Sequence, residues 1–281
     1  MKGLNLSLKR TNCNKTTFFV KDIEIGKDFF VIAGPCSVES EEQILTIARS
    51  VKKSGAKMLR GGAFKPRTSP YSFQGLGKTG LEYLAKAREE TGLPFVTEVM
   101  DTRDVELVAM YADMIQIGAR NIQNFSLLKE VGKTKKPILL KRGFSTTLEE
   151  LLCCAEYILG SGNPNVALCE RGIRTNCSTS KNTFDINAIP SLKELTHLPV
   201  LADPSHGTGV RSLVAPISLA AVVAGADGLL IEVHNSPDQA MSDAEHQLSC
   251  DDFYPLMSDI NLIFETTCKL KTKRGHENEK N

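Results

Sequence analysis

Short apolar segments alternate with longer amphipathic segments along almost the whole chain, and this alternation constrains the fold more than any other feature. Apolar residues recur at helical spacing between the short segments, as they do after Ser40 and Gln43, which form a capping-box pattern. Eight strand-then-helix units over about 240 residues predict one (β/α)8 TIM barrel of class α/β. The expected strands are 28–34, 57–60, 94–98, 114–118, 137–141, 166–172, 199–203 and 228–234.

A doubly wound open sheet is the alternative for such an alternation. The barrel is favoured because eight consecutive units occur without a GxGxxG fingerprint, and no linker-like change of composition divides them. We therefore expect an N-terminal extension over residues 1–28 and a catalytic barrel over 29–270. The segment 271–281 is charged and lacks aromatic residues, which predicts a disordered tail.

Composition excludes several classes of protein. The net charge of +1 over 281 residues provides no general basic field for nucleic acid or an anionic membrane. The most apolar run, 213–226, is too short to span a bilayer, which takes about 20 residues. The N-terminus has no apolar core for a signal peptide, and the eight cysteines lack a framework spacing. We expect a cytoplasmic protein with reduced thiols.

Charged or metal-ligating residues follow each expected strand. In a (β/α)8 barrel the active site lies at the carboxyl ends of the strands. Unpaired charges in register at all eight strand ends would repel one another at the barrel mouth, so a purely structural role explains them poorly. We expect them to line one site. They are Cys36, Arg60 with Lys65 and Arg67, Glu98, Arg120, Lys141, Arg171, His206 and Glu232.

The loop LRGGAFKPRTSPYSFQGLG, residues 59–77, carries three of these cations within eight residues, interleaved with glycine and proline. A solvated turn is the simpler interpretation, but the loop follows an expected strand, where α/β proteins bind ligands. We expect it to bind phosphate or carboxylate. The six cations of the strand ends exceed the need of one phosphate and suggest two phosphates and a carboxylate. Arg142 and Arg174 are assigned to the solvated rim.

A second subset has the chemistry of a metal site. Cys36, His206, Glu232 and an acid from the eighth loop combine a thiolate, an imidazole and carboxylates. Such ligands suit Mn, Fe, Zn or Co better than Mg or Ca. His234 is a rival ligand, because it follows Glu232 by two residues and lies on the same side of its strand.

Several motifs together resemble one enzyme family. They are GPCSVES, KPRTS, TEVMD, QIGARNIQN, LLKRG, LCERGIRT, FDINAIP, DPSHGTG and the pair IEVH and DAEHQ. From about residue 29 to 270 the chain is similar to 3-deoxy-D-arabino-heptulosonate 7-phosphate (DAHP) synthase, in its type Iβ-like, barrel-only form. The motif DAEHQL departs from the DGxQSL that is common in related sequences.

The resemblance implies a function. This family condenses phosphoenolpyruvate with erythrose 4-phosphate on a divalent metal, the first step of the shikimate pathway toward aromatic amino acids. A relative that uses arabinose 5-phosphate, 3-deoxy-D-manno-octulosonate 8-phosphate synthase, is the alternative, although it tends to carry Asn-Arg-Ser in place of KPRTS. A non-catalytic phosphosugar-binding barrel is the alternative that is not an enzyme.

The resemblance also implies site residues. The metal, Mn²⁺ or else Fe²⁺, Zn²⁺ or Co²⁺, would be held by Cys36, His206, Glu232 and Asp243. Lys65, Glu98 and His206 would be catalytic, with Lys65 as a proton donor and Glu98 orienting water. A homodimer or homotetramer is expected. The substrate-binding residues would be Arg60, Lys65, Arg67, Thr68, Ala119, Arg120, Lys141 and Arg171.

Overall fold

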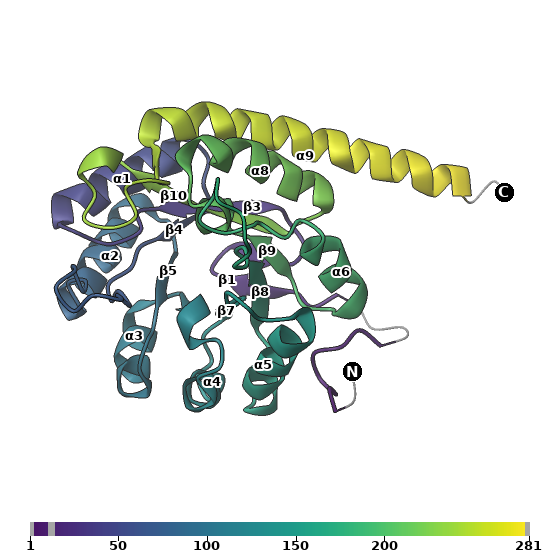
Figure 1. Ribbon diagram of the computed structural model, residues 1–281, viewed down its shortest axis with the longest axis horizontal. Helices are drawn as coiled ribbons and strands as arrows, with labels where there is room; N and C mark the ends of the chain where they lie inside the picture. The colour runs from purple at the N-terminus through teal and green to yellow at the C-terminus, as the bar shows by residue number, and fades with distance from the viewer. Residues whose placement is uncertain (1–2, 11–14, 279–281) are drawn as a thin grey trace.

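A closed barrel of parallel strands forms the centre of the computed structural model, which describes residues 3–10 and 15–278. Each strand of the barrel pairs in parallel with the next, and the last pairs with both its predecessor and the first, which closes the ring (Figure 1). The predicted TIM barrel is confirmed. Its strands are β3 (Phe30–Gly34), β4 (Met58–Arg60), β5 (Phe95–Glu98), β6 (Met114–Ile117), β7 (Ile138–Lys141), β8 (Val166–Glu170), β9 (Val200–Ala202) and β10 (Gly228–His234).

Helices surround the strands, as Figure 1 shows. Their N-termini follow the sequence signals: Ser40 accepts a hydrogen bond from the backbone N–H of Gln43, and Thr147 forms a full capping box with Glu150. The outer helices are α1 (Glu41–Lys53), α2 (Lys78–Thr91), α3 (Val105–Tyr111), α4 (Phe125–Gly132), α5 (Leu148–Gly160), α6 (Ala188–Leu195), α8 (Arg211–Ala224) and α9 (Cys250–Asn278).

Several smaller elements were not predicted. They are the antiparallel pair β1 (Phe18–Val20) and β2 (Ile23–Ile25), the short helix α7 (Pro204–Thr208), the strand β11 (Leu248–Ser249), and the 3-10 turns η1 (Thr102–Asp104), η2 (Ala119–Asn121) and η3 (Pro237–Gln239).

The C-terminal end also differs from the expectation. Helix α9 continues through residues 271–278, where the sequence predicts a disordered tail, and it extends past the barrel in Figure 1. Residues 279–281 lie outside the described part of the chain. None of the described helices is long and apolar enough to cross a membrane.

The barrel interior has its own apolar core, separate from the layer between strands and helices. The unpredicted pair β1–β2 belongs to this interior core, because Phe18, Val20 and Ile25 are buried against its side chains. A backbone bond from Thr16 to His197, just before β9, places the pair at the amino ends of the strands. The strands contribute Phe30, Ile32, Met58, Val96, Met114, Leu139, Ala167, Cys169, Leu201 and Leu230.

Candidate active site

The alternation of side chains along each strand explains why charges gather at one end of the barrel. Residues two apart on a strand point to the same side of the sheet. A residue two positions after an interior apolar residue therefore also points inward, one layer nearer to the carboxyl end. These pairs are Met58 and Arg60, Val96 and Glu98, Met114 and Gln116, Leu139 and Lys141, Cys169 and Arg171, Leu201 and Asp203, and Leu230 and Glu232.

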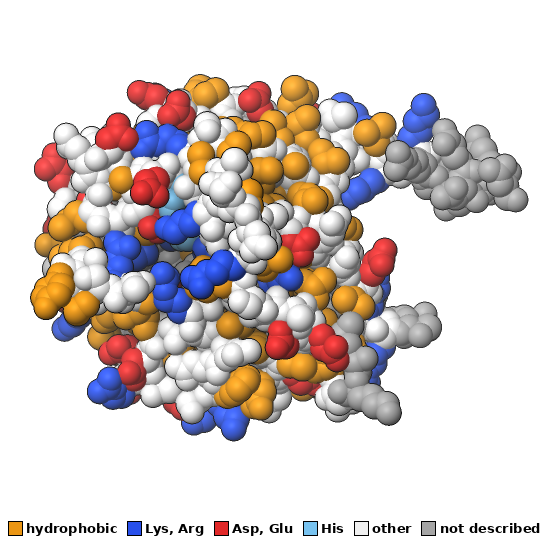
Figure 2. Space-filling model, in the orientation of Figure 1, with side chains coloured by type: hydrophobic (Ala, Val, Ile, Leu, Met, Phe, Trp, Pro, Cys, Tyr) orange, Lys and Arg blue, Asp and Glu red, His pale blue; other side chains and the backbone are white. Residues whose placement is uncertain are grey.

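Most of this layer lines a pocket of about 90 Å³, to which it contributes Arg60, Glu98, Gln116, Lys141 and Arg171. Figure 2 shows Lys and Arg side chains around a hollow in which a histidine is visible. Thr68 is exposed and lies outside this lining. The pocket brings together most of the expected site residues: Arg60, Lys65, Arg67, Glu98, Ala119, Arg120, Lys141, Arg171, His206 and Asp243.

One wall of the pocket is a group of arginines around the ring of Phe144. The guanidinium carbons of Arg171, Arg174 and Arg120 lie 4.7, 5.3 and 5.6 Å from the ring centre. The electron-rich faces of an aromatic ring attract cations, so the ring helps to hold the guanidinium groups close to one another. Burial lowers the pKa of Arg171 from its ordinary value. Such a concentration of positive charge suits a phosphate group.

Lys65 lies at the opposite wall, where the 59–77 loop folds back on itself. Its Nζ donates to Cys36 at 3.0 Å from Sγ and 3.1 Å from the backbone oxygen. Gly62 leaves room for this contact, because an added Cβ would lie 2.7 Å from Cδ of Lys65 and 2.8 Å from the oxygen of Cys36. Burial opposes the charge of Lys65, but the surrounding negative groups, including Glu232, outweigh it and raise its pKa.

Arg67 occupies the outer part of the same loop and is only half-buried. Its Nε donates to the backbone oxygen of Phe73 at 3.2 Å, and its Nη2 donates to that of Met241 at 3.3 Å. The backbone N–H of Lys65 donates to the oxygen of Gln74 at 2.9 Å. These bonds give the loop a fixed shape, which a solvated turn would not need.

Glu98 faces the pocket with one carboxylate oxygen unused. Its Oε2 accepts a hydrogen bond from Gln116 at 3.0 Å, whereas its buried Oε1 has no partner within the described part of the chain. Gly118 is required here, because an added Cβ would lie 2.1 Å from that Oε1. A buried acceptor without a partner costs about 1–3 kcal/mol, so this oxygen is suited to a substrate or a water molecule.

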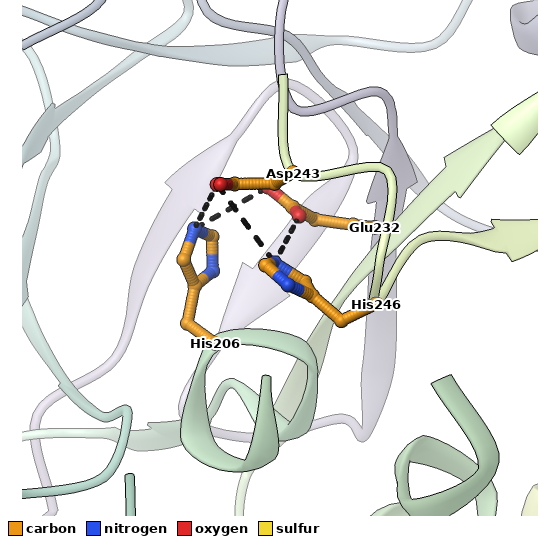
Figure 3. A group of neighbouring side chains, drawn as sticks. All are labelled: His206, Glu232, Asp243 and His246. Atoms are coloured by element: carbon orange, nitrogen blue, oxygen red, sulfur yellow. Dashed lines mark ion pairs between the residues drawn. The ribbon is translucent and has the colours of Figure 1, made fainter. Parts of the chain in front are cut away.

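Four ligand-type side chains meet beside the pocket, and their donor atoms all lie within 4.8 Å of one another (Figure 3). They are His206, Glu232, Asp243 and His246. Three of them belong to the predicted metal set. The fourth predicted ligand, Cys36, adjoins this cluster, since its thiol donates to Oδ2 of Asp243 at 3.2 Å. Burial, with the charge of Glu232, raises the pKa of Cys36 to about 12.

Helix α7 positions His206. Asp203 caps this helix by accepting from the backbone N–H of His206, and its Oδ2 also lies 2.7 Å from Nδ1 of the ring. The second contact turns Nε2 toward Glu232, whose Oε1 is 3.3 Å away. Burial lowers the pKa of His206 to about 4, which leaves the imidazole neutral at pH 7. A carboxylate behind a neutral histidine is the usual arrangement around a protein-bound metal.

The cluster has the charge and the open valences that a divalent cation needs. Burial opposes ionisation of Glu232, but His206 and Arg60 outweigh it and hold its pKa well below the ordinary value. The pKa of Asp243 falls to about 2, although burial again opposes ionisation. Glu232 raises the pKa of His246 despite burial. The negative charge that favours a proton on this ring would also attract a metal ion. A divalent metal therefore fits these residues.

At this end of the barrel the structure excludes one alternative, and one prediction is wrong. His234 is not part of the cluster: its Nε2 lies 3.4 Å from Glu39, and its Nδ1 accepts from the backbone of Ser236 at 2.9 Å. Arg142 is not on the rim, because it is only 5% exposed and its Nη1 lies 2.8 Å from both Glu170 and Asp185. Arg174 is exposed, as predicted.

Three residues of the site were missed. Asp203 could have been found from DPSH, since Asp before Pro is a common start of a helix. His246 stands three residues after Asp243 in DAEHQ, a spacing that one turn of chain brings together. Lys181, which lines the pocket 3.9 Å from Asp243, had no comparable signal.

Known proteins match this chain over most of its length. Phospho-2-dehydro-3-deoxyheptonate aldolase of Thermotoga maritima is 49% identical over 264 residues, which are 94% of this chain and 78% of that protein. A 2-dehydro-3-deoxyphosphooctonate aldolase of Syntrophobacter fumaroxidans is 32% identical and covers 89% of this chain and 94% of its own.

Solved structures agree with these matches. The crystal structure of the Thermotoga maritima DAHP synthase has a TM-score of 0.92 and 48% identity, covering 95% of this chain and 78% of that one. A truncated form of 3-deoxy-D-arabino-heptulosonate 7-phosphate synthase from the same organism has a TM-score of 0.88 and 44% identity, covering 94% and 97%. The family model described as the DAHP synthetase I family matches residues 7–266, and the chain belongs to that family.

Proposed function

We propose that this chain condenses phosphoenolpyruvate with erythrose 4-phosphate to give 3-deoxy-D-arabino-heptulosonate 7-phosphate and inorganic phosphate. The observation that carries the proposal is one pocket that holds the six predicted cations beside a metal-type cluster. The family relationship and the 49% identity to a DAHP synthase support the same activity. The product places the enzyme at the first step of the shikimate pathway.

Phosphoenolpyruvate would lie in the inner part of the pocket. Arg120, Lys141 and Arg171 would bind its phosphate, since guanidinium forks match phosphate oxygens and the Phe144 ring keeps two of them together. Arg60 and Lys65 would bind its carboxylate. Both are buried, and a buried cation beside a carboxylate gains more than one in water.

Erythrose 4-phosphate would enter from the outer side of the 59–77 loop. Arg67 lines the pocket nearer to solvent and Thr68 is exposed next to it, which suits a phosphate at the far end of a four-carbon chain. Ala119 lines the pocket as well. This arrangement would direct the aldehyde carbon toward the inner substrate.

The chain's own groups supply the proton chemistry. Carbon 3 of phosphoenolpyruvate forms a bond to the aldehyde carbon, and the aldehyde oxygen takes a proton, for which the buried ammonium group of Lys65 would be the donor. Water then adds at carbon 2, oriented by the unpaired Oε1 of Glu98. The added water passes one proton to Glu98, and cleavage of the bond between carbon 2 and the phosphate oxygen then gives a carbonyl at carbon 2 and releases inorganic phosphate, which takes the remaining hydroxyl proton. Positioned acids and bases of this kind contribute about 10²- to 10⁴-fold to rate.

Cys36, His206, Glu232 and Asp243 would hold the metal, and His206 would serve catalysis through that contact. When bound, a divalent ion such as Mn²⁺, Fe²⁺, Zn²⁺ or Co²⁺ supplies Lewis acidity toward a carbonyl oxygen. Arg60 contacts one oxygen of Glu232, while the other, Oε2, has no hydrogen-bond partner among the described residues and lies 2.8 Å from Nε2 of His246. The Glu232 carboxylate can therefore contact Arg60 through one oxygen and the metal through the other.

An assay of aldose specificity tests this proposal. The metal-loaded protein receives phosphoenolpyruvate with either erythrose 4-phosphate or arabinose 5-phosphate, and the products are identified by mass spectrometry. We expect the seven-carbon product and a kcat/KM for erythrose 4-phosphate at least about 100-fold higher. Preference for arabinose 5-phosphate would instead identify a 3-deoxy-D-manno-octulosonate 8-phosphate synthase. If neither sugar phosphate is consumed, the chain is a phosphosugar-binding protein without this activity.

A homodimer or homotetramer is proposed for the assembly. Large apolar side chains are exposed on the outer helices, and Figure 2 shows hydrophobic side chains gathered along the edge that α8 and α9 form. Val223, Tyr254 and Leu262 are each more than half exposed. Apolar patches of this kind favour contact with a second copy. Light scattering on the purified chain and on Leu262→Asp would separate an oligomer that uses this face from a monomer.

A further inference from the structure

His246 is a buried, chemically capable side chain that the mechanism above leaves unused. Only 1% of it is exposed, and neither ring nitrogen has a hydrogen-bond partner among the described residues. It lies in DAEHQ, the motif in which this chain departs from the sequences it resembles. A buried imidazole without hydrogen bonds loses the interactions that its nitrogens had with water, so a partner inside the protein must replace them.

An oxygen of Glu232 lies beside His246, and it too has no hydrogen-bond partner among the described residues. Nε2 of His246 lies 2.8 Å from Oε2 of Glu232, and the two atoms do not meet hydrogen-bond geometry. The same Nε2 lies 3.8 Å from Oδ2 of Asp243 (Figure 3). The imidazole and the carboxylate attract each other only when a proton or another cation lies between or beside them, and a metal ion can take that place.

The backbone is arranged to bring His246 to this place. Asp243 adopts a φ of 49°, in the left-handed region, and the N–H of His246 donates to the oxygen of Asp243 at 3.3 Å. Residues other than glycine are uncommon in this region and cluster at functional sites. The resulting turn directs both side chains to one side, where Glu232 and His206 already lie.

The residue after His246 fixes the turn to neighbouring segments at the carboxyl end of the barrel. The side chain of Gln247 accepts from the backbone N–H of Cys36 at 2.9 Å and donates to the oxygen of Ser242 at 2.8 Å. Leu248 then pairs with Val233 at the end of β10. His246 is thus held on both sides, which reduces the entropy that binding a metal would cost.

We propose that His246 is a ligand of the divalent metal, so that this chain holds the ion with two imidazoles and two carboxylates. The inference rests on the metal site of the proposed function. Donor atoms within 4.8 Å of one another can all approach an ion at about 2.0–2.2 Å after small adjustments. Cys36 stands at the edge of this set beside Lys65 and becomes a supplementary ligand.

Counting coordinated imidazoles tests the proposal directly. The full chain is labelled with ¹⁵N-histidine, freed of metal, loaded with Mn²⁺ and studied by pulsed electron paramagnetic resonance without substrate. We expect couplings from two imidazoles in the wild type and from one in His246→Gln. His234→Gln is the matched control, because His234 is buried but lies outside the cluster, and it should keep both.

A single coupled imidazole in the wild type overturns the proposal, and that measurement does not depend on whether a variant folds. An unchanged spectrum in His246→Gln also overturns it. Neither result involves turnover, so the two proposals can fail separately. Two imidazoles without product would contradict the proposed reaction alone, while product formation with one imidazole would contradict only this inference.

Affinity gives a second measure. The Kd for Mn²⁺, from competition with a fluorescent chelator, should rise at least about 10-fold in His246→Gln. Cys36→Ser should raise it less, because both imidazoles and both carboxylates of the cluster remain. An unchanged Kd in His246→Gln would contradict a ligand role for His246, and a larger loss in Cys36→Ser would contradict the supplementary role of Cys36.

Discussion

The two ends of the barrel are made from the same strands and yet have opposite chemistry. At the amino ends, the β1–β2 pair buries Phe18, Val20 and Ile25 against the interior apolar core. At the carboxyl ends, the next inward residues include Glu98 and Lys141, with unpartnered polar atoms among them. The strand alternation is continuous, so the change from apolar to charged happens within a single strand, over two residues.

This difference separates the source of stability from the source of function. A fully buried apolar side chain contributes about 1.5–3 kcal/mol relative to an exposed one, and the interior core toward the amino end is built from such groups. Buried charges at the carboxyl end cost free energy that their ion pairs offset only in part. The apolar end therefore supplies stability that offsets the cost of the buried charges. Substitutions at the apolar end should change the free energy of unfolding, and those at the charged end should change the kinetics.

The largest effect is expected at Lys65. Replacement of Lys65 by Met keeps the length of the side chain but removes the ammonium group beside Cys36. We expect kcat to fall about 10²- to 10⁴-fold, because a proton donor and a substrate charge are lost together. Steady-state kinetics measures this, with Lys53→Met, an exposed lysine on α1, as the control. Near-normal kcat in Lys65→Met would contradict its position in the mechanism.

The opposite end should respond in stability. Ile25→Ala removes a fully buried side chain from the interior core and should lower the free energy of unfolding by about 2–5 kcal/mol. Urea denaturation measures the loss. The control is Phe19→Ala in the same β1–β2 pair, where the ring is 64% exposed and little change is expected. An unchanged free energy of unfolding for Ile25→Ala would contradict the stabilising role of the amino end. A lower kcat in folded Ile25→Ala would contradict the separation of stability from catalysis between the two ends.

A smaller and more selective effect is expected at the outer cation. Arg67→Ala should raise the KM for erythrose 4-phosphate about 10- to 100-fold, since charge-assisted hydrogen bonds to phosphate contribute about 1.5–3 kcal/mol each. The KM for phosphoenolpyruvate should stay nearly constant. Arg49→Ala, an exposed arginine on α1, is the matched control. If only phosphoenolpyruvate binds more weakly, the division of the cations between the two substrates is wrong.

The sequence predicted the barrel well because each strand and helix carries a local signal. Apolar runs and capping residues such as Ser40 and Thr147 depend only on neighbours along the chain. The β1–β2 pair was missed because its two strands are only three residues long and their buried side chains gain their environment from the closed barrel.

The site was predicted less completely, because its geometry depends on contacts between distant segments. Arg142 was assigned to the rim because its partners Glu170 and Asp185 come 28 and 43 residues later. His234 and Glu232 share a strand, as predicted, but the histidine meets Glu39 of another segment. His246 approaches Glu232 only through the turn that Asp243 begins, and a local pattern does not reveal such a contact.

Activity as a function of bound metal tests the central claim, that the charged end works as a metal-assisted condensation site. The protein is depleted with a chelator and titrated with Mn²⁺, and phosphoenolpyruvate consumption with erythrose 4-phosphate is followed together with metal content by elemental analysis. We expect no turnover in the depleted protein and a rise that ends at one ion per chain. Full turnover in protein that contains no metal would contradict the account.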